Sequence, residues 1–539
     1  MSINIVVYLT SVLNENNATA AQNVNAWSGT CYLTPLLGAW VADTFLGRFW
    51  AIFSGSIIYM LGLTGVTISA GLPSLTPAPG EQPTAHQLSF FWGYLVAIGT
   101  GGIKPCVSTF GADQFDEDDP AELAMIPRFY NWFYAFINIG AFLACTLIVW
   151  VQTDVSWTIG FLIPTVSFAI AIAVFLAGSK WYRRKPPGGS ALTRWFRVIA
   201  GAFAHWRAAV PEVARLLHEV DTPMSIIPGQ TRMIHTPEFR WLDKAATPVE
   251  AAGVRDRWLV IVTEVEELKC MVRLLPSMAI LAVYFAIYAQ MSTLFVLQGS
   301  AMDRHLGSWV VPATMVNVLD STSVLIWVPI FDLGIEPYFR RIGRPISRLT
   351  RMGVGFGIAI LSMVCAAPVE IFHLKAVRAN NLQIPQYFLV GMSEVFASVG
   401  SLEFFYSQSQ EAMRSIASAL SLVAAAAGSY LAVSLVAAIT SVSTRGGATG
   451  WVANNLNQGH IDDFFWLLAV LMGVALLAYI PICYTYRYRQ DPAAKVSSRV
   501  VVDRAPKRSS FVPPVHAFEI APVSLGVKGG SLSTKPSEN

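Results

Sequence analysis

Eleven apolar segments, each long enough to cross a lipid bilayer, constrain the fold of this chain more than any other feature. A membrane-spanning helix needs about 20 predominantly apolar residues, and a helix satisfies its own backbone hydrogen bonds in lipid. Charged residues make up only 13% of the 539, fewer than a soluble surface requires. The sequence therefore predicts an all-α polytopic membrane protein. The segments lie near residues 27–47, 49–71, 88–112, 128–151, 156–178, 271–297, 311–331, 347–368, 384–405, 415–440 and 461–484.

A shorter apolar segment, residues 3–13, precedes the first of these. At about 1.5 Å per residue it covers roughly half a bilayer. We interpret it as half of a first helix whose other half is absent. The prediction is therefore eleven full helices and one partial helix.

A long polar stretch divides the apolar segments into two groups. The predicted domains are a helix bundle over 1–178 (the partial helix and helices 2–6), a linker over 179–270, a second bundle over 271–488 (helices 7–12), and a disordered tail over 489–539. Arginine and lysine concentrate in the linker, in the link 332–351 and at the start of the tail. Positive residues favour the cytosolic side, so we expect these three segments to be cytosolic.

Residues 193–220 of the linker predict an amphipathic helix. Trp195, Ile199, Phe203 and Trp206 share one helical stripe, with arginines beside it. Such a helix can lie on the inner membrane surface, or it can pack against the cytosolic face of the protein. The sequence leaves both alternatives open.

Three charged residues fall well inside the apolar segments: Lys104, Asp320 and Glu394. A lysine at bilayer depth costs about 2.5–3.5 kcal/mol on insertion scales, so charged residues in spans mark functional sites. A lysine in one bundle and a carboxylate in the other favour a pair that bridges a central cavity. The alternative is that water and backbone groups satisfy each charge separately.

The sequence offers no cofactor or metal site. Its six cysteines show no paired spacing, and none of its eight histidines lies at the centre of an apolar segment. Nucleophile–base sets and phosphate-binding loops are also missing from the sequence. We therefore expect no cofactor and no enzymatic activity.

Two motifs in the fourth helix carry a family resemblance. The run Gly99-Thr-Gly-Gly-Ile-Lys-Pro-Cys, followed by Phe110-Gly-Ala-Asp-Gln-Phe-Asp, resembles the fourth helix of the proton-coupled oligopeptide transporters, and most of all their plant nitrate/peptide branch. The resemblance extends from about residue 3 to residue 488. It implies a major facilitator fold, in which two six-helix bundles surround a central cavity.

The resemblance also implies roles for the charged residues. In that family the lysine and glutamate that correspond to Lys104 and Glu394 take part in substrate binding, proton coupling and gating. Asp320 lies where many members carry a polar residue that faces the ligand. The expected site thus joins charges from both bundles.

Three uncharged residues match further positions of the family. Asn138 corresponds to an asparagine that contacts peptide backbone, and Tyr32 to a tyrosine of the cavity. Tyr288 takes the place of a histidine that binds nitrate in the plant nitrate carrier, so tyrosine there argues against nitrate and favours peptides. For both tyrosines, simple packing is the alternative role.

The run from Gly38 to Arg48 resembles a loop signature of the major facilitator superfamily. It places an acid, Asp43, at a helix end, then the turn residue Gly47 and the cation Arg48. We expect Asp43 and Arg48 to link two helices at the cytosolic face, which is a structural or gating role.

One family motif is missing. The first helix of the family normally carries a Glu-x-x-Glu-Arg run for proton coupling and for the substrate carboxylate, upstream of where this sequence begins. Met1 is then either an internal methionine of a longer chain, which we favour, or the start of a short form with weakened or lost transport. A short form could act as a regulatory membrane protein.

Taken together, the resemblance implies a symporter of protons and di- or tripeptides that works by alternating access. Its partners are the small substrate, protons and the lipid bilayer, with no nucleic acid, and the expected state is a monomer in the plasma or vacuolar membrane. The alternative substrate is another small solute, such as nitrate, a hormone or a defence metabolite.

Overall fold

A computed structural model describes most of the chain. The compact unit Met1–Arg487 contains every described residue, and Tyr488–Asn539 form a separate unit, so the predicted tail lies outside the described part. The described residues are 4–72, 86–116, 119, 122, 125–184, 191–219, 233–248, 258–302, 304–306, 309–344, 346–375, 383–408, 414–445, 450–453 and 455–486.

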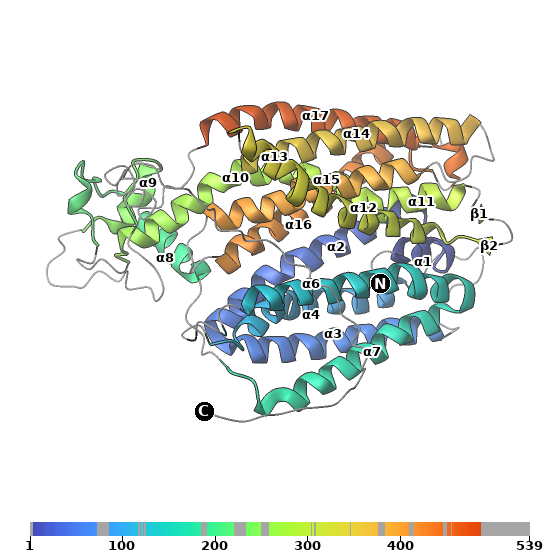
Figure 1. Cartoon of the computed structure of the whole chain (residues 1–539), viewed down its shortest axis with the longest axis horizontal. Helices are drawn as coiled ribbons and strands as arrows, with labels where there is room; N and C mark the ends of the chain where they lie inside the picture. Colours follow the sequence, from blue (N-terminus) through green and yellow to red (C-terminus); the bar gives the residue numbers. More distant parts are fainter. Residues whose placement is uncertain are drawn as a thin grey trace, which may run out of the picture. The chain divides into compact units, whose positions relative to one another are not determined.

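Helices make up nearly all of this structure, which confirms the predicted fold class (Figure 1). Eight helical stretches of the described part are long and apolar enough to cross a membrane. Three further stretches, α2, α4 and the run from α6 to η5, are of comparable length. The described residues also contain one short antiparallel pair of strands, β1 (His305–Leu306) and β2 (Trp309–Val310).

The first group of helices begins with a short helix, as predicted. Its members are α1 (Ile5–Ser11), α2 (Asn17–Val41), α3 (Arg48–Gly71), α4 (His86–Ala112), α6 (Ile126–Leu143) and α7 (Trp157–Ala177). Helix α6 continues into two π-helical segments, η4 (Ala144–Ile148) and η5 (Val151–Val155).

Helix α2 is longer than the sequence predicted, which is a correction to the segment 27–47. It begins at Asn17 because the side chain of Asn16 caps it by accepting a hydrogen bond from the Thr19 amide at 2.7 Å. Such a cap satisfies one of the free amides at a helix start. The polar residues 17–26 are thus part of the bundle and not of a loop.

Glycines let α3 and α4 approach closely. A Cβ atom on Gly55 would lie 2.9 Å from the Cα of Gly102 and 2.9 Å from the carbonyl oxygen of Gly99. Both neighbours are backbone atoms of α4, so even a methyl group would force the helices apart. Small residues at such interfaces are how helices pack in lipid.

The second group of helices begins with α10, which starts nine residues before the predicted segment at 271. Helix α14 packs against α15 and α17, whereas α16 packs against α10 and, across the two groups, against α2. The elements are α10 (Val262–Tyr288), η9 (Ala289–Ser292), α11 (Leu294–Ala301), η10 (Ala313–Asn317), α12 (Val318–Pro329), η11 (Ile330–Ile335), α13 (Glu336–Arg341), α14 (Arg348–Lys375), α15 (Ile384–Gln408), α16 (Arg414–Ser443), η14 (Leu456–Gln458) and α17 (Ile461–Thr485).

The linker helix α8 (Ala191–Ala204) packs against the protein through one face. Val198 and Ala202 are buried there, and Arg194 forms an ion pair with Glu267 of α10 at 3.1 Å. This buried face is not the predicted stripe, in which Ile199, Phe203 and Trp206 are exposed. Both alternatives for the stripe therefore stay predictions. The helix ends at Ala204, well before the predicted residue 220. The other linker elements are η6 (Gly178–Lys180), η7 (Ala214–Leu216), α9 (Arg240–Asp243) and η8 (Lys244–Ala246).

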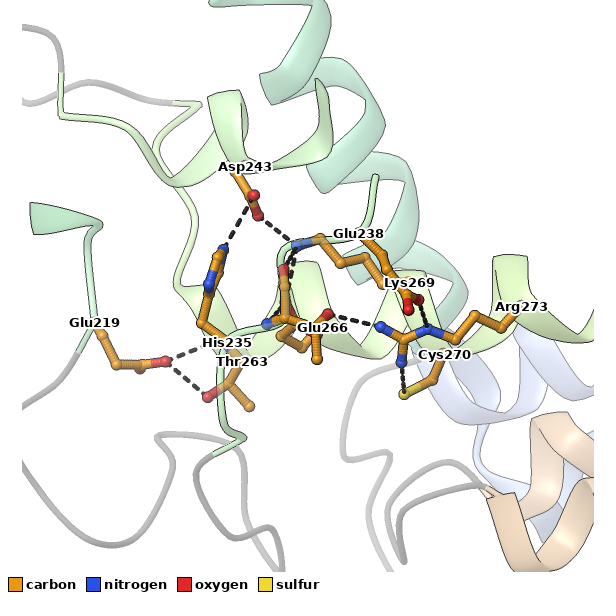
Figure 2. Close-up of polar contacts among 10 residues, drawn as sticks. Glu219, His235, Glu238, Asp243, Thr263, Glu266, Lys269, Cys270 and Arg273 are labelled. Carbon is orange, nitrogen blue, oxygen red and sulfur yellow. Dashed lines mark hydrogen bonds and ion pairs between the residues drawn. The ribbon is translucent and has the colours of Figure 1, made fainter. Parts of the chain in front are cut away.

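A buried lysine holds the end of the linker on α10 (Figure 2). The ammonium of Lys269 lies 2.7 Å from Asp243 and 2.8 Å from Glu266. It also donates a hydrogen bond to the carbonyl oxygen of Thr236 at 2.8 Å. Because all three charged side chains are at most 1% exposed, each depends on the others to offset the cost of burial.

Polar side chains join the two groups at the end of the bundle away from the linker. Asn4, just before α1, donates to Gln152 of η5 at 3.1 Å and accepts from Thr314 of η10 at 2.9 Å. All three are buried. We call these residues the Asn4 bridge. It fastens the first group to the second at this end.

Candidate functional site

A cavity of about 430 Å³ lies between the two groups of helices. On α2 the lining residues Asn25, Ser28 and Tyr32 share one helical face, because residues three and four apart align. On α4, Thr100 and Lys104 align in the same way. The second group contributes residues of α10, η9, η10, α12 and α16, among them Phe285, Tyr288, Ser292, Asn317, Asp320 and Ser429.

Lys104 projects into this cavity. Its side chain is exposed there, and its ammonium lies 4.7 Å from the centroid of the Tyr32 ring. A cation over an aromatic face gains about 0.5–2 kcal/mol. Tyr32 thus positions the cation, and no hydrogen bond from the Lys104 ammonium is found among the described residues.

Glu394 of α15 takes part in the site through a tyrosine. The hydroxyl of Tyr288, which lines the cavity, donates a hydrogen bond to Glu394 at 3.3 Å. This contact connects the carboxylate to a residue of the cavity wall. Tyr288 therefore has a polar role besides packing.

Lys104 and Glu394 form no ion pair among the described residues. The predicted direct pair is therefore not seen in this conformation. Each charge contacts a tyrosine of its own group instead: Tyr32 for the lysine and Tyr288 for the glutamate. The cavity thus separates a cationic side from an anionic side.

Asp320 lies in the first turn of α12 and lines the cavity. Its side chain is 7% exposed, and Oδ1 has no hydrogen-bond partner among the described residues. A Cβ atom on Gly391 of α15 would lie 3.0 Å from Oδ1, so a glycine there leaves room for the carboxylate. Asp320 and Glu394 both belong to the second group.

Asn138 lies in α6, as the resemblance implied. Its side chain is outside the described part of the structure. Its expected contact with peptide backbone therefore stays a prediction.

The turn between α2 and α3 differs in detail from the expectation. Gly47 adopts a φ of 74°, which favours glycine. Arg48 forms an ion pair with Asp113, just beyond α4, and no hydrogen bond or ion pair joins it to Asp43 among the described contacts. The expected helix-linking role of Arg48 is thus present, but its partner is an acid that is close in space and distant in sequence.

Several cavity residues were missed at the level of sequence. Asn25 lies just before the predicted segment 27–47, and Asn317 lies at a helix start. The available signals were the Asn16 cap before α2 and the i, i+3, i+7 spacing of Asn25, Ser28 and Tyr32. Polar residues that share a helical face with an expected cavity residue such as Tyr32 could therefore have been predicted to line the cavity.

A cluster of side chains that could bind a metal ion lies apart from the cavity, where the linker meets α10. His235, Asp243 and Glu266 each place one ligand atom within 4.8 Å of the others, a spacing that could suit a metal ion. However, the ammonium of Lys269 already contacts both carboxylates (Figure 2). This cation takes the position that a metal would need, so the cluster is a structural one.

These features define a class: a multi-span membrane protein with a charged cavity between two helix groups, the architecture of a transporter. A family model described as PTR2, the POT family, matches residues 49–452. "Protein NRT1/ PTR FAMILY 8.1" of Arabidopsis thaliana is 45% identical over 517 residues, which cover 91% of each chain. "Protein NRT1/ PTR FAMILY 8.3" of the same plant is 43% identical over 521 residues, or 91% of this chain and 88% of that protein.

Solved structures show the same fold. An auto-inhibited POT family peptide transporter has a TM-score of 0.69 at 20% identity and covers 91% of this chain and 94% of its own. A POT family transporter in complex with 5-aminolevulinic acid has a TM-score of 0.61 at 15% identity, with 89% and 91% covered.

The chain therefore belongs to the POT family. It is an integral membrane transporter with several spans, and its family consists of transporters and not of enzymes. Membership supports proton-coupled transport as its general activity.

Proposed function

We propose that this transporter carries di- and tripeptides together with protons. The observation that carries the proposal is the separation of charge in the cavity. Lys104 lies on one side with no carboxylate partner among the described residues, and Asp320 and Glu394 lie on the other. A zwitterionic peptide presents the complementary pair of charges.

The peptide carboxylate would bind Lys104, because an ammonium with free donors is the natural partner of a carboxylate. The peptide amine would bind on the side of Asp320 and Glu394. Asn138 would contact the peptide backbone, and Tyr32 and Tyr288 would bound the side-chain pockets. The cavity of about 430 Å³ falls in the range typical of small-molecule sites.

Proton coupling would operate through Glu394. Protonation neutralises a buried carboxylate and so lowers the cost of moving the loaded site through a low-dielectric region. It also weakens the attraction across the cavity that would otherwise hold the two groups together. Acid on the outer side would thereby favour the inward step.

Access to the cavity would alternate as one helix group rocks against the other. The Asn4 bridge closes the end away from the linker, which the arginine distribution predicts to face outside. The structure therefore corresponds best to a state closed toward the outside.

A small anion such as nitrate is the alternative substrate. The two carboxylates at the cavity would repel an anion that carries no amine, and Tyr288 takes the place of the histidine expected for nitrate. We therefore favour peptides over nitrate.

The test is uptake of a labelled dipeptide at acidic and at neutral pH, in cells that lack their own peptide carrier. We expect acid-stimulated uptake by the wild type and its loss, by about tenfold or more, in Lys104→Ala and in Glu394→Gln, because each change removes one charge of the site. Surface expression is measured in parallel.

Matched controls change the same residue types outside the cavity. Lys180→Ala follows α7 at an exposed position, and Glu336→Gln removes one half of an exposed ion pair. Both should transport normally. Normal acid-stimulated uptake by Lys104→Ala and Glu394→Gln would refute the proposed roles, and competition by nitrate but not by dipeptide would favour the alternative substrate.

A further inference from the structure

Asn25 is an unusual residue of the cavity wall. Its side chain is 1% exposed, yet neither its Oδ1 nor its Nδ2 has a hydrogen-bond partner among the described residues. Buried polar groups in folded proteins are nearly always paired. Leaving one without a partner costs about 1–3 kcal/mol.

Two other polar side chains of α2 near Asn25 have hydrogen-bond partners. The indole N–H of Trp27 donates to the carbonyl oxygen of Gly93 at 2.7 Å, and the amide of Asn23 donates to Glu15 at 3.0 Å. The amide of Asn25 differs from these two in having no partner among the described residues, and it lines the cavity. Its missing partner is therefore to be sought in the cavity.

The chemistry of the side chain identifies that partner. An asparagine offers one acceptor and two donors in one plane, which complements the N–H and C=O groups of a peptide backbone. We propose that Asn25 recognises a backbone amide of the substrate, with Oδ1 accepting from its N–H. This inference rests on the proposed peptide transport and names a residue that determines substrate specificity.

The spacing along α2 fits this role. Asn25 and Tyr32 lie seven residues apart on one face, which is roughly 10 Å at about 1.5 Å per residue. Tyr32 contacts Lys104, the cation assigned to the substrate carboxylate. An extended di- or tripeptide spans roughly 7–10 Å. A peptide anchored at Lys104 therefore presents its backbone toward Asn25.

The test compares two substrates that differ in one group. Glycylglycine has an amide N–H, whereas 5-aminolevulinic acid has a methylene group in that place and keeps the carbonyl, amine and carboxylate. A site that hydrogen-bonds a substrate group discriminates against an analogue that lacks it. We expect the wild type to have a lower KM for glycylglycine than for 5-aminolevulinic acid.

Asn25→Leu removes the amide at nearly constant volume. We expect it to raise the KM for glycylglycine by roughly five- to tenfold, the worth of one hydrogen bond, and to reduce the preference over 5-aminolevulinic acid by a similar factor. Because an orphaned polar group is lost, melting in detergent should stay the same or rise. Asn23→Leu, on the same helix, is the control and should leave the preference unchanged.

The outcomes separate the inference from the proposed function. If the wild type takes up glycylglycine and Asn25→Leu keeps the wild-type preference, Asn25 does not recognise the amide and the inference alone is overturned. A fall in melting temperature with an unchanged preference would likewise assign Asn25 a purely structural role. No uptake of glycylglycine by the wild type at the surface would overturn the proposed function, and the inference with it.

Discussion

At the scale of single residues, two of the three charged residues of the site, Lys104 and Glu394, each contact a tyrosine. Tyr32 contacts the ammonium of Lys104 through its ring, and Tyr288 contacts Glu394 through its hydroxyl. The two tyrosines thus act through different parts of the same side chain. Substitution by phenylalanine and by leucine can tell these parts apart.

Tyr32→Leu removes the ring beneath Lys104, whereas Tyr32→Phe keeps it. We expect Tyr32→Leu to raise the KM for dipeptide by about two- to fivefold, since an accessible cation–π contact contributes about 0.5–1 kcal/mol, and Tyr32→Phe to stay near wild type. Tyr338→Leu, on the exposed side of α13, is the control. Equal losses in Tyr32→Leu and Tyr32→Phe would show that the hydroxyl matters and not the ring.

At the scale of elements, packing depends on whether a glycine faces a backbone or open space. The Gly55 position of α3 faces the backbone of α4, whereas a Cβ atom on Gly473 of α17 would have no atom within 4 Å. The same substitution should therefore have opposite consequences at the two sites.

Gly55→Ala is expected to destabilise the protein by about 1–3 kcal/mol, because overpacking forces the two helices apart. Gly473→Ala should be neutral or stabilise slightly, since alanine loses less conformational entropy than glycine in a helix. Thermal unfolding of both variants in one detergent provides the comparison. Equal melting temperatures would mean that α3 and α4 can separate at little cost.

The junction of the linker with α10 gives a second prediction at this scale. Lys269→Met leaves Asp243 and Glu266 buried without their shared cation, which should cost about 3–5 kcal/mol. We expect a lower melting temperature and faster proteolysis of the linker. Arg340→Met breaks only the exposed pair with Glu336 and should cost about 0–1 kcal/mol. Matching protease sensitivity of the two variants would rule out a special role for Lys269.

At the scale of the whole molecule, the Asn4 bridge links the two helix groups at one end only. Opening the cavity at that end must break its hydrogen bonds. Under the proposed alternating access, the bridge favours the state closed at that end, and weakening it should shift the balance toward the open state.

Thr314→Val removes the hydroxyl that donates to Asn4 and keeps the shape of the side chain. A lost hydrogen bond of about 0.5–1.5 kcal/mol should raise the fraction of the state open at that end by roughly two- to tenfold. Distances between spin labels across this end can measure the fraction. Thr322→Val is the control, since the Thr322 hydroxyl donates to the carbonyl oxygen of Val318 in its own helix and to no other group of the described residues. Identical distance distributions in wild type and Thr314→Val would show that the bridge does not resist opening.

Much of the fold could be predicted because spanning length and hydropathy depend on local composition. The sequence placed α3, α7, α15, α16 and α17 within three residues of their observed ends, whereas α14 ends seven residues beyond the predicted segment. It missed the starts of α2 and α10, since both begin with polar residues that hydropathy assigns to loops. Capping by Asn16 and the ion pairs of the linker make those turns helical despite their polarity.

The sequence by itself determined the membrane fold and drew attention to Lys104, Asp320 and Glu394, because a charge in an apolar segment is costly wherever it lies. Only the tertiary structure decided that Lys104 contacts Tyr32, that Glu394 contacts Tyr288, and that the described residues show no ion pair between these two charges. It also brought Asn4 to Gln152 and Thr314, and left the Asn25 amide at the cavity without a partner among the described side chains and backbone. Such contacts join residues far apart in sequence, and hydrogen bonds and ring contacts act only over a few ångströms. Which of these side chains come within bonding distance of one another is therefore decided only when the helices pack.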